Sequence, residues 1–153
     1  MATSPSFKFS SVDLDKLNEL RSALLEGIRK CGEVVLSVNN EPLKKTILTL
    51  EQQSNQYANE LNAQIQALGG HEQIKQDEQT DSNISKKKRK LNIEKQALTI
   101  CGKIEKSVIS LYKKMLHEQL ANEGLKKMIK YQMDGIMCTT LELKLLSKLL
   151  RNQ

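Results

Sequence analysis

The chain has 153 residues, enough for one domain with a substantial core. Hydrophobic residues make up 39% of it but aromatic residues only 3%, and with two Pro and seven Gly most of the chain is free to be helical. The net charge of +6 is moderate, and no apolar run reaches the ~18 residues that a transmembrane helix requires. We therefore expect an all-α protein that does not span a membrane.

The first predicted helix begins near Ser10 or Ser11 and follows residues 1–11, which we expect to form a disordered tail. Ser10 has Asp13 three residues on, a spacing related to the helix-capping box. The tail contains no apolar run of signal-peptide length, so we expect a cytoplasmic protein. Apolar residues recur at helical spacing after it and predict one buried face: Leu14, Leu17, Leu24, Ile28, Cys31, Val35 and Val38.

The second predicted helix begins after Asn40, a good helix cap, with Pro42 in its first turn, where a missing N–H is tolerated. It runs to about Leu68 and stops at Gly69-Gly70, a strong termination signal. The loop that separates it from the first helix has only a few residues. The two helices should therefore form an antiparallel hairpin.

A polar crossover linker is predicted over about residues 71–91. Its basic run lies outside the next helix, because cations destabilise a helix N-terminus: Lys86, Lys87, Lys88, Arg89 and Lys90. One interpretation of this run is a solvated loop, and another is an anion-binding site for an acidic partner or nucleic acid phosphate. A nuclear-import signal is a third. Aromatic residues that stack on bases are absent around it, so we do not expect nucleic acid as the partner.

The third predicted helix begins near Asn92 and fades near His117, and the fourth begins after Asn122, a plausible cap. Twenty linker residues can span about 60 Å, whereas each of the first two helices is about 40 Å long. The linker can therefore cross the bundle from end to end. These elements predict one domain over residues 12–151, with two antiparallel hairpins joined by a long crossover, which is the ferritin-like arrangement of a four-helix bundle.

Two stretches of the chain share a plan at a distance of 82 residues, 41–47 (EPLKKTI) and 123–129 (EGLKKMI). From there the helical spacing of the apolar face is repeated, in alternating steps of four and three. The first series is Leu43, Ile47, Leu50, Ser54, Tyr57, Leu61, Gln64 and Leu68. The second is Leu125, Ile129, Gln132, Ile136, Thr139, Leu143, Leu146 and Leu150. The repetition favours two similar hairpins.

Five stretches carry a resemblance to a known family: 17–20 (LNEL), 26–27 (EG), 43–57, 59–61 (NEL) and 68–70 (LGG). They resemble a bacterial ferritin-like family, a rubrerythrin-related set of small, largely uncharacterised four-helix-bundle proteins, some of which are linked to stress responses. The resemblance covers about residues 12–150 and is best over the first hairpin. It implies a ferritin-like fold and, in the metal-binding members, a pair of metal ions in the core.

Ferritin-like enzymes hold two iron ions with a Glu from each of two helices and a Glu-x-x-His from each of the other two. By this resemblance the ligand positions fall at Leu24, Ser54, Tyr57, Glu105, Met137 and Thr140. Only Glu105 is a carboxylate, and the two His of the chain, His71 and His117, belong to no Glu-x-x-His. We therefore predict no metal site and no cofactor, with Glu105 as the one candidate ligand.

Several polar residues interrupt the apolar faces. Such residues predict a polar core layer that can fix the register of the helices, formed by Ser54, Tyr57, Glu105, Gln132 and Thr140. Under an alternative interpretation, Glu105 binds a small cation. The three cysteines lie far apart and form no C-x-x-C, so we predict reduced thiols that act as small apolar filler: Cys31, Cys101 and Cys138.

No phosphate-binding glycine loop, dinucleotide fingerprint or nucleophile motif is present in the sequence. We therefore expect a non-enzymatic structural or interaction protein that forms a homodimer and has an unidentified protein partner or none. One alternative is a degenerate iron- or manganese-binding protein, an oxidase or iron-handling protein, centred on Glu105. A second alternative is a basic protein that associates with nucleic acid through Lys86–Lys90.

Overall fold

The computed structural model describes residues 11–69, 93–118 and 123–151. These residues form four helices and no strand: α1 (Ser11–Val35), α2 (Glu41–Ala67), α3 (Ile93–His117) and α4 (Glu123–Arg151). The predicted all-α four-helix bundle is thereby confirmed, and helix ends agree with the expected ones to within a few residues. None of the described helices is both long and apolar enough to cross a membrane. Residues 1–10 of the predicted tail lie outside the described part of the chain. So does the whole predicted linker over 71–91.

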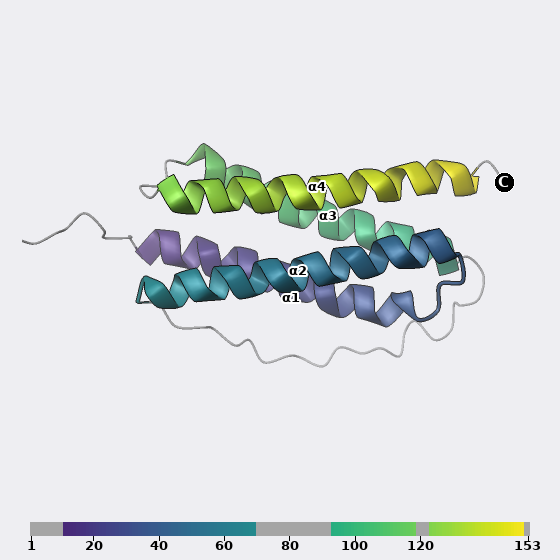
Figure 1. Ribbon diagram of the computed structural model, residues 1–153, viewed down its shortest axis with the longest axis horizontal. Coiled ribbons are helices and arrows are strands. Elements are labelled where there is room, and N and C mark those ends of the chain that lie inside the picture. Colours follow the sequence, from purple (N-terminus) through teal and green to yellow (C-terminus); the bar gives the residue numbers. More distant parts are fainter. Residues whose placement is uncertain (1–10, 70–92, 119–122, 152–153) are drawn as a thin grey trace, which may run out of the picture.

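The four helices pack as a square in which α1 contacts α2 and α3, and α4 also contacts α2 and α3. Figure 1 shows that the chain reverses direction between the members of each contacting pair. The diagonal helices α2 and α3 run in the same direction, so the end of α2 and the start of α3 lie at opposite ends of the bundle (Figure 1). This is the relative direction that the linker length predicted.

Local sequence signals at the ends of α2 are confirmed. The Asn40 side chain accepts a hydrogen bond from the Leu43 N–H at 3.0 Å, and Pro42 occupies the first turn. At the other end, the Gly69 N–H donates to the Gln66 carbonyl at 3.0 Å with a φ of 86° at Gly69. Such a left-handed conformation favours glycine because it has no Cβ.

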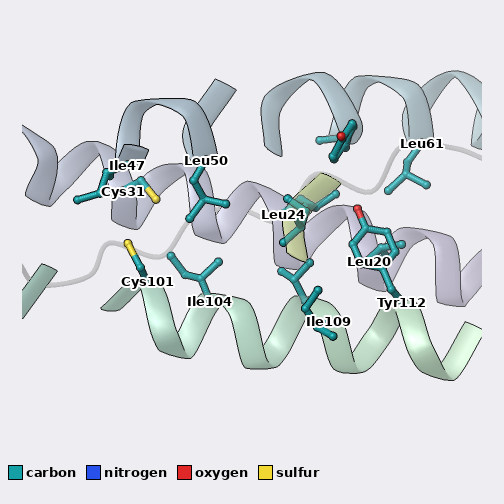
Figure 2. Close-up of a cluster of buried hydrophobic side chains, with 14 of the residues drawn as sticks. Leu20, Leu24, Cys31, Ile47, Leu50, Leu61, Cys101, Ile104, Ile109 and Tyr112 are labelled. Carbon is teal, nitrogen blue, oxygen red and sulfur yellow. The ribbon is translucent and has the colours of Figure 1, made fainter. Parts of the chain in front are cut away.

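The repeated spacing of α2 and α4 marks the core face of both helices. The first six positions of each series are buried, and the last two are half-buried. Around them lies an aliphatic core that Figure 2 shows in part, with Leu20 and Leu24 of α1 facing Ile109 and Tyr112 of α3. The repeat is therefore a repeat of buried positions, and where it carries polar residues those residues lie inside the bundle.

Candidate functional site

Gln132 on α4 is the centre of a buried polar layer and is 0% exposed. Its side-chain carbonyl accepts a hydrogen bond from the Tyr112 hydroxyl of α3 at 2.9 Å. Its amide donates to the Glu60 carboxylate at 2.9 Å and to the Tyr57 backbone carbonyl at 3.4 Å, both on α2. One glutamine side chain thus connects three helices, and its donor and acceptor are both satisfied.

The aromatic side chains of this layer are held in their neutral form. Burial raises the pKa of Tyr112, and the nearby Tyr57 and Glu60 raise it further. Burial is also the main reason that the pKa of Tyr57 is raised, followed by Tyr131 and Glu60. A neutral phenol remains a hydrogen-bond donor, which is the role that Tyr112 has toward Gln132.

Tyr57 packs directly against the backbone of α4 at Gly135. A Cβ at Gly135 would overlap the Tyr57 hydroxyl and lie 3.2 Å from its ring carbon Cζ. The Tyr57 ring also makes an edge contact with Tyr131, one turn earlier on α4, with ring centroids 6.2 Å apart. Gly135 is therefore required for the close approach of α2 and α4, although glycine lowers the stability of a helix interior relative to alanine.

A second polar link between the same helices lies one turn along. The Thr139 hydroxyl donates to the Gln53 side-chain carbonyl at 2.6 Å, and the Gln53 amide donates to the Gly135 carbonyl at 3.3 Å. The interface between α2 and α4 is therefore specified by polar contacts at adjacent turns. Such contacts are satisfied only in one register, because a shift of either helix leaves buried groups without partners.

Of the residues predicted for the polar layer, the structure brings Tyr57 and Gln132 together. Ser54 is buried on the same face of α2 as Tyr57, but Thr140 turns its hydroxyl back to the Met137 carbonyl of its own helix at 3.1 Å. The layer also includes Glu60 and Tyr112, which the sequence reasoning missed as members. Glu60 could have been found from its position three residues after Tyr57, which places the two on one side of α2.

Glu105 does not join the Gln132 layer. Its carboxylate lies at the outer edge between α3 and α4, where Lys144 forms an ion pair with it at 3.3 Å. The two side chains border a small cavity of about 110 Å³ between these helices, together with Leu98, Cys101, Gly102, Thr140, Leu143 and Ser147. The predicted polar layer had placed Glu105 together with Ser54, Tyr57, Gln132 and Thr140. The structure provides a lysine instead.

The residues at the expected ligand positions do not fit a two-metal centre. Leu24 is fully buried and aliphatic, and Met137 is 41% exposed on the outside of α4. Glu105 is already paired with the Lys144 ammonium group. A second positive charge beside that ammonium would be repelled, so the pair does not favour metal binding. No group of three or more His, Cys, Asp or Glu in the described parts of the chain is arranged to hold a metal ion.

The cysteine prediction was wrong for Cys138, which is exposed, whereas Cys31 and Cys101 are buried as expected. Helix phase explains the error, because Cys138 follows directly after Met137 and lies on the outward side of α4, away from the core series. The basic run Lys86–Lys90 lies outside the described residues.

The outward side of α4 carries an apolar stripe with residues four apart. We call Met137, Leu141, Leu145 and Leu149 the outer stripe; they are 41%, 57%, 55% and 61% exposed. Asp134 and Lys148 border it, and Asp134 forms an exposed ion pair with Lys130 at 3.1 Å. Isolated exposed leucines are common on proteins, but a continuous stripe on one helix is typical of a contact surface.

Comparison of the chain with protein-family models, with curated proteins and with solved structures found no match in any of the three.

Proposed function

We propose that this chain is a non-enzymatic interaction protein, a ferritin-like bundle without a working di-metal centre that self-associates through α4. The observation that carries the proposal is the outer stripe, where Leu141, Leu145 and Leu149 are each more than half exposed. The interior of the bundle, by contrast, is filled with aliphatic side chains and a satisfied hydrogen-bond layer. The outer stripe lies outside this core, on the solvent-facing side of α4, where a partner can reach it.

A ferritin-like arrangement is supported by the directions of the helices. Contacting helices are antiparallel, and the parallel pair α2 and α3 lies on a diagonal (Figure 1). Membership of the stress-associated family, a cytoplasmic location and the absence of enzymatic activity form part of the same proposal. The alternative centred on Glu105 is weakened by its ion pair with Lys144.

The occupant that we propose for the outer stripe is a second copy of the chain, with the two α4 helices antiparallel and crossing at Leu141. In this register Met137 of one copy faces the partner's Leu145. Asp134 faces the partner's Lys148, so that opposite charges meet at both ends of the contact. The symmetry is the isologous one expected of a homodimer. Because the stripe spans only about 18 Å of helix, the dimer should be weak, with a dissociation constant of about 10 µM.

Replacing Leu141 and Leu145 by Glu should therefore abolish self-association. Sedimentation velocity of the full chain over about 1–100 µM should show a concentration-dependent dimer for the unmodified protein and a monomer for the double variant. Leu36→Glu is the matched control, because Leu36 lies outside α4 and is 80% exposed. The Leu36→Glu variant should dimerise to the same extent as the unmodified protein.

The antiparallel register has a test of its own. In the background Cys138→Ser, Leu141→Cys should form an intermolecular disulfide under mild oxidation, because the two positions meet at the crossing point. The native Cys138 should not form an intermolecular disulfide, since in this register it faces position 144 of the partner and not the partner's Cys138. Monomeric unmodified protein at 100 µM, or equal loss of dimer in the Leu36 control, would refute self-association through this surface.

A further inference from the structure

Two buried cysteines of different hairpins lie opposite one another in the core. Cys31 on α1 is 1% exposed, and Cys101 on α3 is 2% exposed. Figure 2 shows their sulfur atoms directed toward each other between the two helices. The hydrogen bond between these thiols raises the pKa of Cys31, as does burial, and the same bond lowers the pKa of Cys101. Of the two, only Cys101 lines the cavity between α3 and α4, so it is the thiol that an oxidant reaches first.

Contacts elsewhere along α1 and α3 give the same register. At one end of the pair of helices, the Asn39 N–H donates to the Glu94 carboxylate at 3.3 Å. At the other end, Lys16 forms an ion pair with Glu118. Between these contacts α1 and α3 run antiparallel. The helical register that satisfies both ends brings position 31 opposite position 101.

Close packing beside the cysteines favours a short sulfur–sulfur approach. A Cβ at Gly27 would lie 3.0 Å from the Ile104 methyl group Cγ2, so α3 rests on the backbone of α1 at this turn. Cys31 and Cys101 lie one turn away on the same faces. A disulfide requires Cα atoms about 4.4–6.8 Å apart. The absence of a Cβ at Gly27 allows the close approach of α1 and α3 that this separation requires.

We propose that Cys31 and Cys101 are an oxidation site, at which hydrogen peroxide converts the two thiols to a disulfide that joins the two hairpins. The Cys101 thiolate attacks a peroxide oxygen, the O–O bond breaks, and the hydroxide that leaves takes up a proton to become water. Cys31 then attacks the sulfenic sulfur of Cys101, its proton leaves with the oxygen as a second water, and the S–S bond forms. The two sulfurs are oxidised by two electrons in total, and hydrogen peroxide is reduced to two waters. This proposal is independent of the dimer.

The cavity between α3 and α4 is the route that we assign to the oxidant. Cys101 lies on its wall, Gly102 follows on the same helix, and a Cβ at Gly102 would meet no atom within 4 Å. A volume of about 110 Å³ admits a molecule of the size of water or hydrogen peroxide. Larger oxidants, such as glutathione disulfide, should react much more slowly.

The test uses the full chain, with the exposed Cys138 first blocked by iodoacetamide under native conditions. One equivalent of hydrogen peroxide should then produce one proteolytic fragment that links the peptides of Cys31 and Cys101 and is about 2 Da lighter than the two peptides together. Dithiothreitol should reverse both changes. The melting temperature should rise by several degrees, because the bond closes a loop of roughly 70 residues in the unfolded chain. Cys31→Ser should gain oxygen without the loss of 2 Da.

Two results would overturn the proposal. The first is a gain of oxygen on the unmodified thiols without a linked peptide, and the second is a linked peptide that forms only in denaturant. A further experiment tests the route of the oxidant. Gly102→Leu fills the cavity and should slow peroxide oxidation at least about fivefold, while Gly102→Ala should slow it less. An unchanged rate in Gly102→Leu would exclude the cavity as the path.

Discussion

Replacing Gly135 by Ala should lower the free energy of unfolding by about 2 kcal/mol, although Ala normally stabilises a helix relative to Gly by about 1 kcal/mol. The reason is the overlap of the new Cβ with the Tyr57 hydroxyl, with Cζ only 3.2 Å away. Tyr57 is 4% exposed and its ring packs on α4 at Gly135 and Tyr131, so it has little room to move. Urea denaturation, followed by circular dichroism at 222 nm, measures the loss.

Gly102→Ala is the control for this change, because a Cβ there meets no atom within 4 Å. It should raise the free energy of unfolding by about 0.5–1 kcal/mol. Combining Gly135→Ala with Tyr57→Phe removes the overlapping oxygen and should recover at least half of the loss. A stabilised Gly135→Ala variant would show that α2 and α4 do not approach as closely as described.

Replacing Gln132 by Leu should cost about 2 kcal/mol, even though the two side chains are similar in size. The loss arises because the buried Tyr112 hydroxyl no longer has its acceptor at 2.9 Å, and a buried donor without a partner costs about 1–3 kcal/mol. Glu60 is only half-buried and can turn toward solvent, so its part of the loss should be smaller. Denaturant unfolding measures the cost at neutral pH.

Removing both partners should restore most of that stability. The double variant Gln132→Leu, Tyr112→Phe leaves an apolar layer with no unsatisfied hydroxyl, and its free energy of unfolding should return to within about 1 kcal/mol of the unmodified protein. Thr46→Val serves as a comparison, because Thr46 is buried but bonds only to the Pro42 carbonyl of its own helix. Additive losses in the double variant would mean that Gln132 and Tyr112 are not coupled.

Much of the fold could be predicted because local signals determine it. The Asn40 cap, Pro42 and Gly69 act within one turn of the chain, and each has the expected role in the structure. The repeated spacing in α2 and α4 defined their core faces, since the period of a helix determines which side chains share a side. These are properties of single helices and require no knowledge of their neighbours.

The candidate site was harder to predict because it depends on contacts between helices. The sequence identified Gln132 as a polar interruption but not its bond to Tyr112, which depends on the relative position of α3 and α4. In the same way Glu105 proved to face Lys144, a residue on another helix. The pairing of Cys31 with Cys101 and the Tyr57 contact at Gly135 also join residues far apart in the chain.

The central claim is that the bundle is held together by its own side chains and serves as an interaction scaffold without a metal centre. Metal analysis of the full chain purified from iron-supplemented medium tests it most directly. Iron and manganese should be far below one ion per chain, and a chelator should leave the melting temperature unchanged. Near-stoichiometric iron that is lost in Glu105→Ala but retained in Lys144→Ala, which removes the same ion pair and keeps the carboxylate, would contradict the account.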